Sequence, residues 1–137
     1  MAAALATATR FYAAMVASYF AGVTTCFAAD CPTVTPAGSM NPTEHKAFGR
    51  AFKAALPDAH MEIEKAVEAG SEVFIAGRFR STHTGDLATQ QGTLPASGTP
   101  LDLPYADYFR VEGGQIVEHR VYSDQVEMMA QFGASPQ

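Results

Sequence analysis

The sequence predicts an α+β fold in which helices pack on one face of a curved antiparallel sheet. Its 137 residues are enough for one domain, 1–137. Apolar residues recur every three or four positions as far as residue 56, and they alternate at strand spacing from residue 60 onward. Helices followed by a run of strands are typical of a sheet covered on one side.

The first 31 residues could be a secretory signal, because Arg10 precedes a mostly apolar stretch that ends in small residues. Polar residues interrupt that stretch, so it is too polar for a membrane-spanning helix. Aromatic and aliphatic side chains recur in it at helical spacing. We therefore favour two buried helices, at about 3–19 and 21–28, and a cytoplasmic chain.

A further helix is predicted to start at Asn41. Asn41 is a good N-cap, Pro42 suits the first helical position, and Glu44 can complete a capping box. Pro57 should end this helix. Its predicted buried stripe consists of Phe48, Phe52 and Ala55.

Alternation of side chains then predicts four strands, at about 60–67, 72–83, 101–111 and 115–123. Residues 31–40 should form a loop or a short edge strand, and residues 84–100 a long loop. Ser123 or Asp124 should cap a last helix that ends near Phe132, with Gly133 as its stop.

Charged residues make up 17% of the chain, below the roughly 25% of an average domain. Such a chain either hides part of its surface against a partner or folds around an apolar cavity. Its net charge of −5 argues against nucleic acid or an anionic membrane as partner. Cys26 and Cys31 are a poor zinc site and no disulfide framework, so we expect two reduced, partly buried thiols.

The register of the last hairpin decides which side chains face inward. A two-residue turn at Gly113-Gly114 would mix charged and apolar residues on both faces. A three-residue turn separates them, and it places Asp107 opposite His119 on the apolar face. We therefore predict that register, with His83 facing the same side. A carboxylate and imidazoles on an apolar surface are costly unless they pair, meet water or bind a ligand.

Several stretches of the chain resemble the SnoaL-like polyketide cyclases, in the superfamily of nuclear transport factor 2, ketosteroid isomerase and scytalone dehydratase. The stretches that carry the resemblance are Ala54–His60, Gly77–Gly85, Tyr105–His119, Asp124-Gln125 and Gln131–Gly133. The order and spacing of elements from Phe11 to Gly133 are also similar to that family. One fold hosts many reactions, so the resemblance is specific for the family and weak for the chemistry.

The resemblance implies a cone-shaped α+β barrel with a deep pocket between the helices and the concave face of the sheet. It also implies a homodimer through the outer face, and aldol ring closure without cofactor or metal. The family's pattern has a histidine where this chain has Asp107, and its acid/base aspartate falls on Val121. The resemblance therefore leaves Asp107 to supply the carboxylate at that depth.

The leading hypothesis is a cofactor-independent cyclase or isomerase for a hydrophobic, carbonyl-bearing small molecule. Asp107 would be the acid/base, supported by His119 and His83. The alternatives are a hydratase or epoxide hydrolase, a non-catalytic binder of an apolar ligand, and an interaction module. Asp124 could be a second carboxylate, but a helix cap is favoured. Candidate core or pocket-wall residues are Tyr12, Phe52, Phe79, Tyr105, Phe109, Val121 and Met129.

Overall fold

A computed structural model describes residues 3–17, 20–36, 38–89 and 92–131. Its helices are α1 (Ala3–Val16), α2 (Phe20–Cys26), α3 (Pro42–Ala55) and α4 (Gln125–Gln131). Its strands are β1 (Thr33–Thr35), β2 (Gly38–Met40), β3 (His60–Ala69), β4 (Glu72–Thr82), β5 (Leu87–Thr89), β6 (Gly92–Leu94), β7 (Pro100–Glu112) and β8 (Gln115–Ser123). This order confirms the predicted α+β class, with helices first and the long strands after them.

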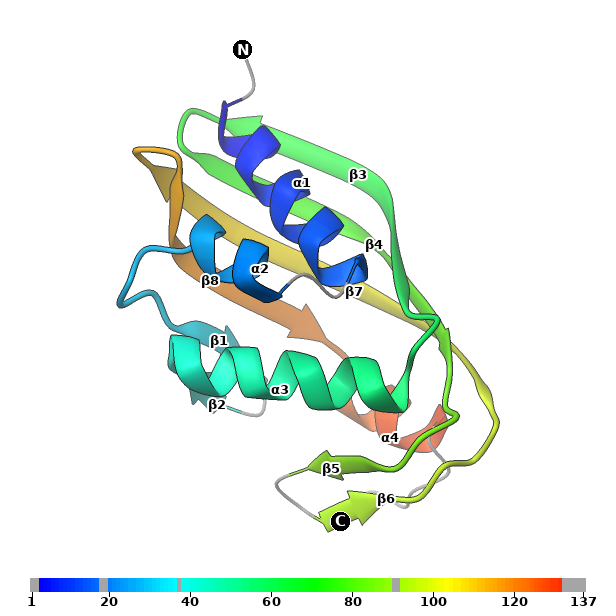
Figure 1. Ribbon diagram of the computed structural model, residues 1–137. Helices are drawn as coiled ribbons and strands as arrows, with labels where there is room; N and C mark the ends of the chain where they lie inside the picture. The colour runs from blue at the N-terminus through cyan, green and yellow to red at the C-terminus, as the bar shows by residue number, and fades with distance from the viewer. Residues whose placement is uncertain (1–2, 18–19, 37, 90–91, 132–137) are drawn as a thin grey trace.

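Six strands form one sheet in the order β2-β1-β8-β7-β4-β3. In Figure 1 the sheet is strongly curved, and α1, α2 and α3 lie across its concave face. The prediction of a purely antiparallel sheet is wrong at one place, because β1 pairs in parallel with β8, Thr33 beside His119. Parallel strands need a long connection, and the chain between β1 and β8 runs through β2, α3 and β3 to β7.

Helix α3 begins as predicted. The Asn41 side chain accepts a hydrogen bond from the Glu44 backbone N–H (2.8 Å), and Glu44 accepts one from the Asn41 N–H (2.9 Å). The predicted buried stripe is only partly right. Ala55 is fully buried and Phe52 half-buried, but Phe48 is 42% exposed, with its ring tilted and 5.4 Å from that of Phe52.

The β7–β8 hairpin has neither of the two simple registers. Glu112 pairs with Gln115 across a two-residue Gly113-Gly114 turn, in which both glycines have positive φ. The partner then jumps from Ile116 to Glu118, so that Val117 is an extra, bulged residue. Asp107 therefore lies opposite Val121, and the predicted direct pairing with His119 is wrong.

Residues 84–100 are not only a loop, because they contain the small β5–β6 hairpin. Helix α4 is capped as predicted, with Asp124 Oδ1 accepting from the Glu127 N–H at 3.0 Å. Phe132 and Gly133, the predicted end of this helix, lie outside the described residues.

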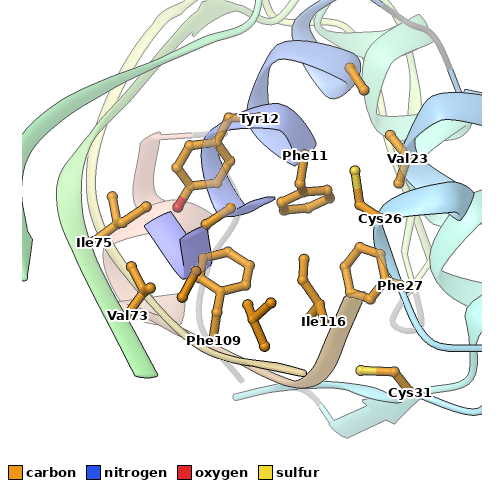
Figure 2. Close-up of a cluster of buried hydrophobic side chains, with 14 of the residues drawn as sticks. Phe11, Tyr12, Val23, Cys26, Phe27, Cys31, Val73, Ile75, Phe109 and Ile116 are labelled. Carbon is orange, nitrogen blue, oxygen red and sulfur yellow. The ribbon is translucent and has the colours of Figure 1, made fainter. Parts of the chain in front are cut away.

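The buried side chains form two clusters. The larger one joins α1 and α2 to the sheet. Figure 2 shows Phe11 from α1 and Phe27, just after α2, meeting Phe109 and Ile116 from the strands. The smaller one lies where α3 ends, around Leu56 and Leu101. Cys26 and Cys31 are free and buried in the larger cluster, as predicted. Among the described helices, none is both long and apolar enough to cross a membrane.

Candidate active site

Asp107 and His119 meet inside the larger cluster, although they are not direct cross-strand partners. His119 lies opposite Phe109, which places its ring diagonally from Asp107 on the same face. His119 Nε2 is 3.3 Å from Asp107 Oδ1, and the two residues are 2% and 3% exposed. The bulge at Val117 turns His119 inward. The predicted contact between Asp107 and His119 is therefore confirmed, although the register that produces it differs from the predicted one.

Tyr12 holds the other oxygen of the carboxylate. Its hydroxyl donates a hydrogen bond to Asp107 Oδ2 from helix α1. The sequence indicated Tyr12 only as a core or pocket-wall residue, and it gave no sign of this hydrogen bond. Tyr12 and Phe11 are adjacent on α1, and both rings contact Phe109 (Figure 2).

The two phenols beside the carboxylate stay protonated at neutral pH. Burial, and then the negative charge of Asp107, raises the pKa of Tyr12 well above its usual range. Burial also raises the pKa of Tyr105 to about 12. The Tyr12 and Tyr105 rings lie edge to face, 6.1 Å apart. Both hydroxyls are therefore neutral hydrogen-bond donors next to a buried acid.

Two residues that the sequence did not select extend this network. Thr33 Oγ1 lies 3.1 Å from His119 Nδ1 and 3.2 Å from His45 Nδ1. His45, on α3, is half-buried between α2 and β8, with its ring 5.5 Å from that of Phe27. Burial, and then His119, lowers the pKa of His45 to about 4, against a smaller opposite effect of Asp107. The parallel β1–β8 pairing that creates these contacts has no local sequence signal.

Aromatic rings enclose the imidazole of His119. Phe109 stacks on it with ring centroids 4.6 Å apart, and Phe11 meets it edge-on at 5.4 Å. Phe27 contacts it at 5.6 Å. The ring is thus fixed in position by packing as well as by its two hydrogen bonds.

His83 does not join this cluster. It is fully buried, but Nδ1 lies 3.2 Å from Ser97 Oγ and its backbone bonds to Thr99 and Gly98. On β4 the cross-strand partner of Asp107 is Ile75. His83 lies farther along the chain, about 25 Å from Ile75 at roughly 3.3 Å per residue. Parity placed His83 on the correct face, but parity cannot show the distance along a strand.

The remaining predicted wall residues surround the site at different depths. Tyr105 is buried beside Tyr12, whereas Phe79 is half-buried between the two clusters and meets the ring of Phe52 at 5.4 Å. Asp124 caps α4 and is exposed. The side chain of Met129 lies outside the described ones.

Asp107 does not line either of two cavities that lie near this cluster. The larger, about 260 Å³, follows the edge of β8 beyond β1, and its lining includes Thr35, Arg120 and Val121. One of its lining residues, Val121, is the cross-strand partner of Asp107. The smaller, about 60 Å³, lies between α2 and α3.

Nothing in the described chain gathers three or more potential metal ligands. The groups around Asp107 are phenols and imidazoles, which suit proton transfer.

Comparisons with known proteins place this arrangement in context. The sequence pattern of the SnoaL-like polyketide cyclases matches residues 6–132. A search of curated proteins found no match. Among solved structures, the chain is similar to AclR from Streptomyces galilaeus, a candidate hydroxylase (17% identity, 99% of each chain, TM-score 0.85).

It is also similar to IdmH from Streptomyces antibioticus, a candidate polyketide cyclase (23% identity, 96% of this chain and 99% of that one, TM-score 0.79). A Catenulispora acidiphila protein with a ketosteroid isomerase-like fold is 24% identical over 93% of this chain and 92% of its own, with a TM-score of 0.75. At these identities the structures show the fold alone, whereas the family match covers almost the whole sequence. The chain therefore belongs to the SnoaL-like polyketide cyclase family.

Proposed function

We propose that this protein is a cofactor-independent enzyme that moves a proton on a hydrophobic, carbonyl-bearing small molecule, in a cyclisation or isomerisation. The observation that carries the proposal is Asp107, a carboxylate 3% exposed on the concave face of the sheet. Tyr12 and His119, two side chains able to exchange or donate protons, hold it. Family membership supports the substrate class, since the family includes polyketide cyclases.

In this mechanism the Asp107 carboxylate removes a proton next to the substrate carbonyl and later returns it. The enolate that forms between these steps needs hydrogen-bond donors in a dry site. The Tyr12 hydroxyl already donates to Asp107, so the donor to the enolate is Tyr105, which remains protonated and whose bond to the Glu62 carbonyl is long at 3.5 Å. His119, fixed by its stacking on Phe109, keeps the carboxylate oriented.

The change at Val121 is compatible with this assignment. The family resemblance places its acid/base aspartate at that position. Here Asp107 is the direct cross-strand partner of Val121. Compared with the family pattern, the carboxylate therefore lies on the neighbouring strand and on the same face of the sheet. The side chains of such partners start about 5 Å apart. Because Val121 also lines the larger cavity, we propose that a substrate approaches Asp107 from that side.

The test is Asp107→Asn, with Asp102→Asn as its matched control. Asp102 lies on the same strand but on the outer face, paired with Arg78. With polyketide-like carbonyl substrates, we expect kcat/KM of D107N to fall by about 10²–10⁴ and that of D102N to stay near wild type. Equal turnover by D107N and the wild type would overturn the assignment.

A second candidate is water activation, as in a hydratase or an epoxide hydrolase. The Asp107–His119 pair favours it, because a carboxylate and an imidazole can share the proton of an attacking water. Oxygen from labelled water would appear in the product of this reaction and not in that of an aldol closure.

We propose further that the protein forms a homodimer through the outer face of the sheet. Phe74 and Tyr122 are each about half exposed there, and Phe74 packs on Tyr108. Covering these rings would bury apolar area that a chain with few charges leaves open. Light scattering of the wild type should give twice the chain mass, and Phe74→Glu should shift it toward the monomer.

A further inference from the structure

A continuous path of hydrogen bonds leads from Asp107 out to His45. It runs from Asp107 Oδ1 to His119 Nε2 (3.3 Å), from His119 Nδ1 to Thr33 Oγ1 (3.1 Å), and from Thr33 Oγ1 to His45 Nδ1 (3.2 Å). Each step joins two groups that can both give and take a proton. The four residues come from β7, β8, β1 and α3, so the path exists only in the folded chain.

The hydroxyl of Thr33 fixes the direction of this path. It has one proton to donate, and both of its partners are imidazole Nδ1 atoms, so at least one of the two imidazoles must donate to it. When Asp107 is ionised, His119 donates Nε2–H to it, and a neutral His119 then accepts at Nδ1. Thr33 must donate to His119, and His45 must donate Nδ1–H to Thr33. The network thus assigns one tautomer to each histidine.

Reversing every bond gives one other arrangement. Asp107 is then protonated and donates to His119 Nε2, His119 Nδ1–H donates to Thr33, and Thr33 donates to His45 Nδ1. The two arrangements differ by a single proton. A proton arriving at His45 Nε2 releases the one on Nδ1 to Thr33, Thr33 passes its own to His119 Nδ1, and His119 Nε2–H passes to Asp107. No charge is left along the path.

The outer end of the path meets a separate cavity. His45 lines the cavity of about 60 Å³ between α2 and α3, together with Val23, Phe27, Ala28, Ala29, Cys31, Pro42 and Lys46. A volume of 10–15 Å³ already holds a water molecule, so there is room for solvent at His45. The other titratable groups packed near His45 are Cys31 and Lys46 at this cavity and His119 and Asp107 behind it. The low pKa of His45 keeps it neutral, as both arrangements require.

We propose that Thr33 and His45 form a proton relay that connects Asp107 to solvent on the side away from Val121. This proposal rests on the assignment of Asp107 as the acid/base. The relay lets the carboxyl group gain or lose a proton while a substrate occupies the side at Val121. Thr33 and His45 are then positioning residues that act through His119 and do not touch the substrate.

The first measurement is the tautomer of each histidine, read from nitrogen chemical shifts of the uniformly ¹⁵N-labelled protein near pH 7. We expect His45 to carry its proton on Nδ1 and His119 on Nε2. In Thr33→Val, which keeps the shape and removes the hydroxyl, His45 should change to the Nε2–H form. Thr33→Ser should keep the wild-type tautomers. A wild-type His45 protonated on Nε2, or an unchanged His45 in T33V, would overturn the proposal.

The second measurement is the exchange of the His119 ring N–H with deuterated solvent. A relay predicts that T33V slows this exchange on the order of 10²-fold and that T33S restores it, since a positioned acid/base group typically speeds proton transfer by that much or more. Backbone amides of β8 report local opening of the strand, and the exchange rate of each amide should be the same in the wild type, T33V and T33S. An unchanged His119 rate in T33V would refute the relay.

Neither measurement needs a substrate. Failure of the acid/base assignment, seen as full activity of D107N, is therefore distinguishable from failure of the relay, seen in the tautomers and the exchange rates.

Discussion

Strand β7 carries two aspartates that face opposite sides of the sheet. Asp102 points outward, where Arg78 Nε lies 2.6 Å and Arg80 Nε 3.5 Å from its carboxylate, and its side chain is 51% exposed. Asp107 points inward, and its hydrogen-bond partners among the described residues are a phenol and an imidazole. Outer-face carboxylates pair with arginines in water, whereas the inner one depends on hydrogen bonds in a dry site.

The comparison shows why charge pairing is a poor guide to function in this protein. The outer face also pairs Arg80 with Glu62, and both Arg110 and Arg120 with Glu118. Such exposed pairs are worth little, because water already solvates both partners. A buried carboxylate has no such support, so it persists only where donors are built around it.

The largest difference between the two faces should appear in stability. Phe109 is fully buried and stacks on His119, whereas Phe74 is 51% exposed on the outer face. Phe109→Ala should lower the free energy of unfolding by about 3–5 kcal/mol, through lost burial and a cavity. In the monomer, at a protein concentration where light scattering gives the single-chain mass, Phe74→Ala should cost less than about 1 kcal/mol. Urea unfolding followed by circular dichroism measures both, and similar losses would contradict the inner–outer distinction.

The next largest difference concerns the hydroxyl groups that bind carboxylates on each face. Tyr12 donates to Asp107 inside, and Tyr108 donates to the exposed Glu72 outside at 2.6 Å. Tyr12→Phe removes a hydrogen bond to a buried charged group and should destabilise the fold by about 1.5–3 kcal/mol. Tyr108→Phe should have almost no effect, because water replaces its hydroxyl. Equal losses of stability in urea for the two variants would contradict a special need of the buried Asp107 for its hydrogen-bond donors.

His45, at the outer end of the path, should also make the stability of the fold depend on pH. The pKa of His45 falls from 6.5 to about 4 on folding, so the unfolded chain binds the proton more readily. The contribution is intact above pH 6.5, declines as the pH falls to 4, and is then constant. The total loss should be about 1–3 kcal/mol.

Denaturant midpoints measured between pH 4 and 7 test this dependence. His45→Gln should remove the decline, whereas His60→Gln, at a side chain 52% exposed, should keep it. A decline that persists in H45Q would assign the effect to another group.

The sequence predicted the fold because each of its signals is local. The capping box at Asn41, the cap at Asp124 and the alternation along β7 depend on neighbours in the chain. The bulge at Val117 escaped prediction, since a one-residue register change gives no pattern of its own. His119 still faces inward because the bulge corrects its parity.

The site was predicted only in its central pair. Asp107 and His119 stand out as polar residues on an apolar strand face, which is visible in the sequence. Tyr12, Thr33 and His45 come from three other elements, and a tyrosine or threonine in a core segment is ordinary. Their role depends on the packing of α1 and on the parallel pairing of β1, which no spacing encodes.

Asp58 sharpens the comparison, because it is an exposed carboxylate held by neutral donors. Ser81 Oγ donates to Oδ1 at 2.6 Å and the Thr82 N–H at 2.8 Å, and these bonds lower the pKa of Asp58 to about 2. A lowered pKa in the folded state means that the stabilisation is present above the unfolded value of 3.8. It is lost as the pH falls toward 2. Asp58→Asn should therefore flatten the stability profile between about pH 5 and 2.

Salt separates the effect of neutral donors from that of charge. The Asp102 ion pairs should weaken in about 0.5 M sodium chloride, because screening acts on both charges at the surface. The bonds of Asp58 to Ser81 and Thr82 involve no cation, so the difference in unfolding midpoint between D58N and the wild type should be the same in low and high salt. If salt removes that difference too, Asp58 behaves like Asp102, and the kind of donor matters only where the carboxylate is buried.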